Sequence, residues 1–242
     1  MSFLSQFEVG DGTRSYHGLL LSAQRRAARG VTVSTNYTLS HCISDANGTA
    51  TPGNTDFLDD NNRRFDRGRC TSDLRHILNL TSVAETPQFS NTMIRRLATG
   101  WRLSGLFRVT SGSPMTVING VDRQLSGKGT QRPVQVLGNP YGNGSLTNFL
   151  NPSAFVQPAI GSLGNMGPLN ISGPKLWQLD MALSRVFQLR ERGRLEARAE
   201  AFNLTNSLRP MNPILNLSSA TFGQILAAQD PRILQFALKY VF

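Results

Sequence analysis

The sequence predicts an all-β fold and, more narrowly, a portion of an antiparallel transmembrane β-barrel with about seven long strands. Three observations support this prediction. Apolar and polar residues alternate along many segments, short basic turns alternate with long loops, and the chain ends on an aromatic strand. Hydrophobic residues make up 39% of the 242 residues and charged residues 17%, which suits strands and turns better than helices around an apolar centre.

The alternation has a period of two. In the segment 31–40 the odd-numbered positions are mostly apolar and the even-numbered positions are all polar, and 101–111, 177–187 and 194–202 repeat the pattern. A soluble sandwich also alternates, but its strands usually have about 5–6 residues, whereas tilted membrane strands have about 9–11. Length therefore favours the barrel. We expect strands near 15–26, 31–40, 75–84, 99–111, 177–188, 194–204 and 232–242.

The predicted connections fall into two kinds. Short basic turns at 26–30 and 190–193 each join two strands into a hairpin. Segments rich in Gly, Asn and Pro separate the hairpins, and 85–98 forms a longer turn on the side of the short turns. Outer-membrane barrels place short turns in the periplasm and long loops outside. The long loops are expected at 41–74, 113–176 and 205–231.

The last strand has one continuous apolar face that ends in an aromatic residue. Its residues are Phe236, Leu238, Tyr240 and Phe242. Such an ending resembles the signal read by the outer-membrane insertion machinery. The alternative is an ordinary edge strand, which would expose a long apolar edge that soluble proteins avoid.

The net charge of +10 comes mainly from arginine. These arginines are scattered, and no basic stripe is interleaved with aromatic residues, so nucleic-acid binding is not expected. No apolar run approaches the ~18–20 residues of a membrane helix. The segment MSFLSQFEVGDG is no signal peptide, so we expect that Met1 is not the true start of a working gene product.

The sequence predicts no enzyme, no cofactor and no metal site. The three histidines are far apart, and none forms a ligand pair at metal spacing. Polar residues on the alternating strands are instead candidates for the wall of a lumen, where carboxylates and arginines on one face form ion pairs rather than an acid–base pair. The lumen-facing candidates are Arg102, Arg108, Asp180, Glu196, Arg198, Glu200 and Lys239.

Cys42 and Cys70 are the only cysteines, and both fall in the predicted loop 41–74. In an oxidising compartment two cysteines usually pair, so we expect a disulfide between them. In a cytosolic protein they would be free buried thiols.

Several short stretches together resemble the Oar-like TonB-dependent receptors, in order and spacing across nearly the whole chain. They are 16–19, 36–40, 66–68, 73–76, 101–105, 111–114, 161–165, 173–174 and 199–206. The resemblance implies a plugged barrel of the large transporter class, in which about 22 strands are typical. It also implies uptake of a scarce nutrient, not identified by the sequence, with energy passed from the inner membrane.

The chain departs from the full receptor pattern, because it shows no plug, no periplasmic N-terminal domain and only about a third of the strands. We therefore expect residues 1–242 to be the C-terminal segment of the barrel, with TonB reached only through parts not in this sequence. The expected partners are outer-membrane lipid, lipopolysaccharide and the insertion machinery. Two alternatives stay open: a small autonomous outer-membrane pore or adhesin barrel, and a soluble basic β-protein that binds polyanions.

The sheet is not expected to close on itself. Seven antiparallel strands are an odd number, so pairing the first with the last would create a parallel pair, whereas bacterial barrels keep an even count. The segments 16–26 and 232–242 should therefore form its edges.

Overall fold

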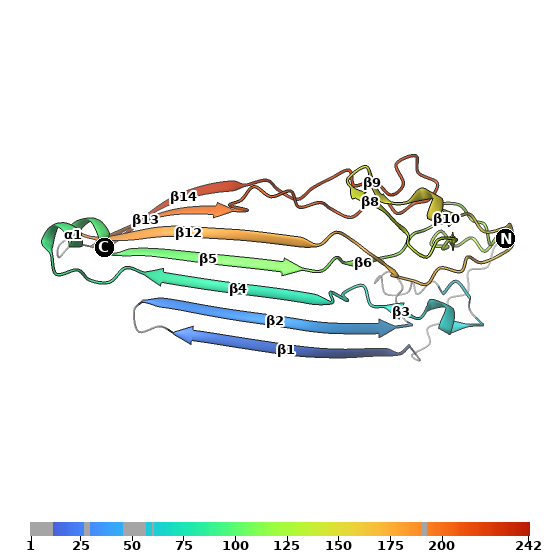
Figure 1. Cartoon of the computed structure of the whole chain (residues 1–242), viewed down its shortest axis with the longest axis horizontal. Coiled ribbons are helices and arrows are strands. Elements are labelled where there is room, and N and C mark those ends of the chain that lie inside the picture. The colour runs from blue at the N-terminus through green and yellow to red at the C-terminus, as the bar shows by residue number, and fades with distance from the viewer. Residues whose placement is uncertain (1–11, 27–29, 46–56, 60, 190–192) are drawn as a thin grey trace.

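The computed structural model describes residues 12–26, 30–45, 57–59, 61–189 and 193–242. Seven long strands form its main sheet (Figure 1), and each pairs antiparallel with the next along the chain. They are β1 (Arg14–Arg26), β2 (Val31–Ser44), β4 (His76–Glu85), β5 (Trp101–Thr110), β12 (Leu176–Gln188), β13 (Arg194–Phe202) and β14 (Ile233–Val241). The two-residue strand β3 (Gly68–Arg69) extends the sheet beside the end of β2. The predicted all-β fold is confirmed.

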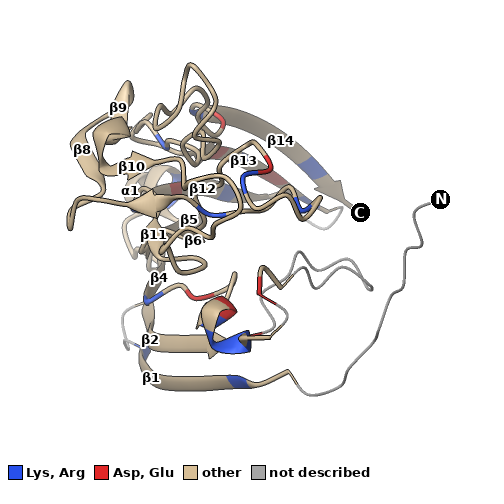
Figure 2. Ribbon diagram, turned by 90° about the vertical axis from the view of Figure 1, so that its right-hand side faces the viewer, with Lys and Arg blue, Asp and Glu red and all other residues tan. Residues whose placement is uncertain are grey.

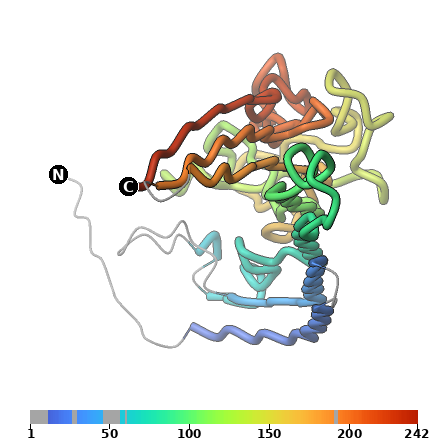
Figure 3. Tube along the Cα trace, turned by 90° about the vertical axis from the view of Figure 1, so that its left-hand side faces the viewer, coloured from blue at the N-terminus to red at the C-terminus, as the bar shows by residue number. Residues whose placement is uncertain are grey.

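The sheet is strongly curved and open. Viewed along the strands, it follows a C-shaped path from β1 to β14 (Figure 3), and these two edge strands do not pair within the described residues. The expectation that this sheet does not close is therefore confirmed. The cap described below and the long connections lie at one end of the sheet, the loop end, and the short connections at the other, the turn end (Figure 1).

The strand registers divide the sheet into two faces. One row across the polar face joins Asn36 of β2, Asn79 of β4, Arg108 of β5 and Gln178 of β12. The opposite face carries rows of apolar residues, such as Leu103 of β5 with Leu183, Ala199 and Phe236.

The polar face is the concave one. Residues 61–75 lie inside the curve of the sheet (Figure 3), and they bind to β2 through Ser40 and Cys42. The Ser40 hydroxyl donates to the Leu74 carbonyl at 3.1 Å. Because side chains alternate, Ser40 and Cys42 lie on the same face as Asn36. The convex face is therefore the apolar one.

The long strands have almost no buried apolar side chains. Among the described residues, Cys42 at the loop end of β2 is the only hydrophobic residue of these strands that is buried. The side chains of the apolar face are half-buried or exposed, and Phe236 is 77% exposed. A patch of this size is unfavourable in water, so the face needs hydrocarbon around it.

The hydrophobic core lies instead outside the sheet, in two segments at the loop end. We call residues 111–175 and 203–232 together the cap. Its core contains Met115, Val117, Leu150, Ala154, Phe155, Met166, Ile171 and Phe222. Short elements frame it: β6 (Pro114–Met115), β7 (Val134–Gln135), β8 (Tyr141–Ser145), β9 (Asn148–Leu150), η2 (Pro152–Ala154), β10 (Phe155–Val156) and β11 (Ile171–Ser172). In pairs, β6 joins β11, β7 joins β10 and β8 joins β9.

The two cap segments are joined through their backbones as well as through this core. The N–H groups of Phe149 and Leu150 both donate to the Gly223 carbonyl at 3.1 Å, and Leu217 N–H donates to Ile118 at 2.8 Å. Gly223 has a φ of +77°, and a Cβ there would lie 2.6 Å from the Leu150 carbonyl oxygen. Only glycine fits this contact without strain.

The prediction that 113–176 and 205–231 are simply long loops was therefore incomplete. Their core residues follow neither helical nor strand periodicity, because β6–β11 have only two to five residues each. The predicted long loop 41–74 begins later than expected, because the strand β2 extends to Ser44. The same segment also contains a short 3₁₀ helix, η1 (Arg63–Asp66). The tips of both predicted short turns, 27–29 and 190–192, lie outside the described residues.

The turn 85–98 contains a short helix, α1 (Thr92–Ala98), that the sequence did not predict. Asn91 caps it, because its side-chain oxygen accepts from the Met93 and Ile94 N–H groups. Arg185 lies on the apolar face beside this turn, 5.1 Å from the Trp101 ring, and its guanidinium donates to the Arg96 carbonyl. The Arg185 guanidinium thus leaves the apolar face and reaches the polar backbone of the turn at its end. In the described part of the chain, no helix is long and apolar enough to cross a membrane.

The cap should be a separately stabilised unit. Leu150 is fully buried in its core, so Leu150→Ala should destabilise the cap by about 2–5 kcal/mol. Leu226→Ala is the matched control, because Leu226 also belongs to the cap but is 61% exposed, and surface changes cost less than about 0.5 kcal/mol. Limited proteolysis in increasing urea measures this difference. Equal resistance of the two variants would contradict the packed core.

Candidate functional site

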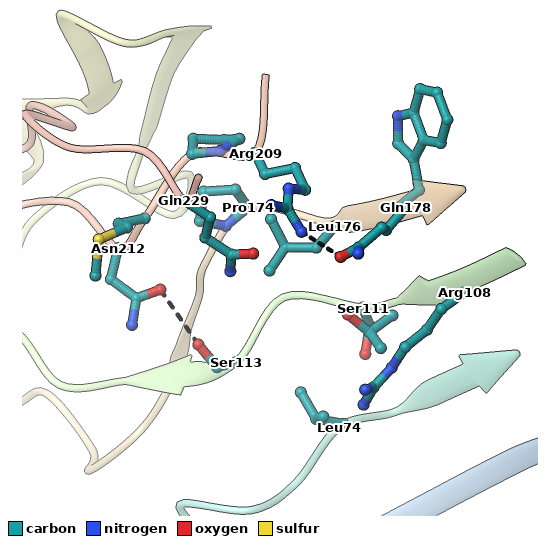
Figure 4. A pocket seen from close by; sticks show the side chains of 14 residues that line it. Leu74, Arg108, Ser111, Ser113, Pro174, Leu176, Gln178, Arg209, Asn212 and Gln229 are labelled. Carbon is teal, nitrogen blue, oxygen red and sulfur yellow. Dashed lines mark hydrogen bonds between the residues drawn. The ribbon is translucent and has the colours of Figure 1, made fainter. Parts of the chain in front are cut away.

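A cavity of about 400 Å³ lies where β5 and β12 run into the cap (Figure 4). We call it the chamber. Residues of β5 and β12, with neighbouring residues of the first cap segment and Leu74, form one wall, and the second cap segment forms the other. Its lining residues are Leu74, Arg108, Thr110, Ser111, Ser113, Pro174, Leu176, Trp177, Gln178, Arg209, Pro210, Met211, Asn212 and Gln229. A volume of this order is enough for a small organic molecule.

Gln178 and Arg209 join the two walls of the chamber. One guanidinium nitrogen of Arg209, Nη1, donates to Gln178 Oε1, and Nη2 donates to the Asp230 carbonyl at 2.7 Å (Figure 4 draws the first contact). Arg209 Nε is buried without a hydrogen-bond partner among the described residues. This arginine thus holds the cap segment 203–232 against the sheet.

Asp180 also stabilises the contact between β12 and the second cap segment. Its carboxylate accepts from the Gln178 amide at 2.7 and 2.8 Å and from the Asn203 N–H at 2.8 Å. Asn203 is fully buried and closes a tight loop with Ser207, whose N–H and hydroxyl both donate to Asn203 Oδ1 at 3.0 Å. The predicted lumen-facing Asp180 is therefore an anchor for the cap.

Arg108 differs from Arg209 in having no partner among the described residues. It lies next to Gln178 in the ladder, is exposed, and extends toward the chamber (Figure 4). Its guanidinium makes no hydrogen bond or ion pair with any described residue, and no acidic residue is among the described residues that line the chamber. Asp180, in the adjoining row of the ladder, accepts from the Gln178 amide and the Asn203 N–H and does not line the chamber. The described lining of the chamber thus carries two arginines and no carboxylate.

The remaining lining combines hydrogen-bonding groups with apolar surface. Ser113 donates to Asn212 Oδ1 at 3.2 Å, which leaves the Asn212 amide nitrogen available as a donor. Leu74, Leu176 and Met211 supply apolar surface. The arrangement can hold a molecule that has both a polar and an apolar part.

A buried ion pair attaches the loop 61–75 to the cap. Arg132 Nη1 lies 2.7 Å from Asp66 Oδ1, and both side chains are less than a tenth exposed. Arg132 also donates to the Met166 and Phe65 carbonyls at 2.7 and 2.9 Å. Burial lowers the pKa of the Arg132 guanidinium, and the hydrogen bond and charge of Asp66 oppose this effect. Figure 2 shows the basic and acidic positions of η1 inside the curve of the sheet.

The structure joins Cys42 and Cys70 in a disulfide with a Cα–Cα distance of 5.3 Å. The Cys70 N–H also donates to the Cys42 carbonyl at 3.0 Å, and the Cys42 N–H donates to Asp73 Oδ1 at 2.8 Å. The bond ties the loop 61–75 to the loop end of β2, next to the chamber residue Leu74.

The other lumen-facing candidates share the concave face with Arg108 but lie away from the chamber. Arg198 pairs with Glu196 and Glu200 at 3.2 and 3.4 Å on its own strand. Arg102 pairs with Glu85 at 2.6 Å, and Lys239 lies opposite Glu196. These contacts form an ion-paired wall. Within the described residues, no group of three or more His, Cys, Asp or Glu side chains could hold a metal ion.

The C-terminal candidates all lie at one edge of the sheet. Their exposed fractions are 77% for Phe236, 71% for Leu238, 51% for Tyr240 and 99% for Phe242. Their role in insertion stays a prediction.

Sequence reasoning did not find Arg209, Arg132 or Asp66. All three lie in connections without periodicity. Arg209 is 31 residues from its side-chain partner Gln178, and Arg132 and Asp66 are 66 residues apart. Nothing in a single sequence pairs such residues. Arg108, Asp180 and the two cysteines could be singled out because strand alternation and cysteine count are local signals.

Long antiparallel strands, a convex apolar face and a concave polar face define an outer-membrane type of β-sheet. The family model described as "Outer membrane beta barrel domain" matches residues 5–235, so the chain belongs to this family and is an outer-membrane protein. This finding overturns the alternative of a soluble polyanion-binding protein. Neither the curated proteins nor the solved structures contain a match to the chain.

The disulfide can be tested directly. Cross-linking residues 28 apart should stabilise the loop 42–70 by about 3–4 kcal/mol on the chain-entropy model. Mass spectrometry of non-reduced peptides from oxidatively folded protein should show Cys42 and Cys70 linked. Two free thiols that react with an alkylating agent would contradict the bond.

Deletion of Phe242 should lower the amount of protein in the outer membrane without lowering its synthesis. The reason is that the exposed aromatic end is the predicted insertion signal. Pulse labelling measures synthesis, and immunoblots of outer-membrane fractions measure assembly. Lys239→Ala, on the other face of β14, serves as control. An unchanged outer-membrane yield after the deletion would exclude this role.

Proposed function

We propose that the chain is the C-terminal barrel part of a TonB-dependent outer-membrane receptor and that it binds a nutrient at its loop end for uptake. The observation that carries this proposal is the chamber between the cap and the polar face. The resemblance to the Oar-like receptors, quoted above from short stretches across the chain, supports it. The family membership is consistent with it but is broader, because it includes outer-membrane barrels in general.

The construction of the cap favours binding over free diffusion. A pore needs an open passage, whereas here about 65 residues of one segment and 30 of another pack around a common core at the loop end. Arg209 and Asp180 hold the cap to the sheet, and the pair Arg132–Asp66 ties it to the neighbouring loop. A cavity whose walls are fixed before binding saves the ordering cost of a ligand site.

The proposal assigns the partners as follows. The convex face contacts outer-membrane lipid, and lipopolysaccharide surrounds the loop end. The insertion machinery reads the C-terminal strand. TonB acts through parts of the receptor outside residues 1–242. The proposal contains no enzymatic step and no cofactor.

An autonomous pore or adhesin is the alternative. It would need the sheet to close, because each unpaired backbone group in hydrocarbon costs several kcal/mol. Within the described residues the edges of β1 and β14 are not paired with each other, so the observation favours a sheet that other strands complete.

Genetic interaction with TonB tests the proposal. Cells lacking this gene should grow poorly on a subset of nutrients supplied at low concentration. Cells lacking TonB should share that defect, and loss of both should be no worse for that subset, because both act in one pathway. Growth on a panel of limiting nutrients measures this relation, with excess nutrient as the rescue control.

Additive defects would contradict the receptor and favour a pore. A defect that persists in excess nutrient would also contradict it, since it would indicate damage to the envelope rather than lost uptake.

A further inference from the structure

We infer that the chamber binds an organic oxyanion, that is, a carboxylate or a phosphate ester attached to an apolar body, and that Arg108 is the residue that selects it. This inference rests on the proposed function, because it names the class of ligand for the same site. Two features carry it. The described lining of the chamber has no acidic residue, and it combines an arginine that has no partner among the described residues with a second arginine that is anchored in the wall.

The two arginines have different tasks. Arg209 donates hydrogen bonds to Gln178 and to the Asp230 carbonyl, so its guanidinium already has partners within the wall of the chamber. Arg108 has all five of its N–H donors free with respect to the described residues. A guanidinium is planar and matches the two oxygens of a carboxylate or phosphate in a bidentate contact.

The neighbours of Arg108 explain why it has no partner in the ladder. Asn79 and Gln178 are its cross-strand neighbours, and neither carries a charge. By contrast, Arg102, six residues earlier on the same strand and on the same face, pairs with Glu85 at 2.6 Å. Among the described residues, Arg102 of β5 thus has an acidic partner, whereas Arg108, where the chamber begins, has none.

The rest of the lining defines the body of the ligand. Leu74, Leu176 and Met211 provide apolar contact, and the Asn212 amide nitrogen is a further neutral donor. A bare inorganic ion would leave these apolar walls in contact with water. An apolar group that carries the anion would cover them, which is favourable in proportion to the area removed from water.

Matched probes test the inference. The complete receptor that contains this chain is placed in lipid nanodiscs and titrated with 3-phenylpropionate, phenyl phosphate and the neutral 3-phenylpropionamide, and binding is followed by saturation-transfer NMR. We expect at least one anion to bind about tenfold or more tightly than the amide, since a charge-assisted hydrogen bond is stronger than a neutral one. The comparison of the two anions distinguishes a carboxylate ligand from a phosphate ligand.

Three variants identify the residue. Arg108→Gln should abolish the preference for the anion while leaving binding of the amide unchanged, which shows that the chamber is still folded. Arg108→Lys should keep part of the preference, because the charge remains but the bidentate geometry is lost. Arg102→Gln should keep the full preference, since Arg102 lies outside the chamber.

An equal affinity of the wild-type protein for the anions and the amide would overturn the inference, as would a preference that survives Arg108→Gln. Absence of anion binding in the millimolar range would overturn it as well. These outcomes leave the receptor proposal intact, because that proposal depends on the genetic interaction with TonB. Additive growth defects together with an Arg108-dependent preference would instead retain the ligand class and reject the receptor.

Discussion

Hydrocarbon offers no hydrogen-bonding partner to a peptide group, so every N–H and C=O of a membrane-spanning strand must pair with a neighbouring strand. The long ladder from β1 to β14 gives each inner strand a hydrogen-bonded neighbour on both sides and leaves two edges. Alternation of side chains then forces one face toward lipid and the other toward the concave side. Curvature, polarity and the position of the chamber all depend on that ladder.

The same constraint explains where the hydrophobic core lies. Because the apolar residues of the strands face outward, they cannot pack against each other across the sheet, and the described strands bury almost no apolar side chain. Packing of the kind found in soluble proteins occurs in the cap, around Leu150, Ile171 and Phe222. The sheet supplies a rigid frame, and the cap, anchored at Asp180 and Gln178, gives the loop end a defined cavity.

Sequence alone predicted the seven long strands to within a few residues, because most of them alternate between apolar and polar residues with a period of two, which reflects lipid on one side and polar surroundings on the other. It also singled out Arg108, Asp180, Cys42 and Cys70. It did not predict the cap, because cap packing joins residues such as Leu150 and Phe222 that are distant in sequence and belong to elements too short to be periodic. The role of Asp180 as an anchor depends on Asn203 in the same way, since only the fold brings the two together.

The central claim is that the convex face of this sheet contacts lipid while the concave face does not. Nitroxide scanning of positions 102–109 on β5, in lipid bilayers, tests it most directly, with molecular oxygen as the apolar probe and a nickel complex as the polar one. We expect the collision rates of the nitroxide to alternate along β5 with a period of two. A nitroxide that replaces Leu103, Phe107 or Val109 should collide mainly with oxygen, and one that replaces Ser104 or Arg108 mainly with the nickel complex. Uniform accessibility to the nickel complex, or the inverse alternation, would contradict it.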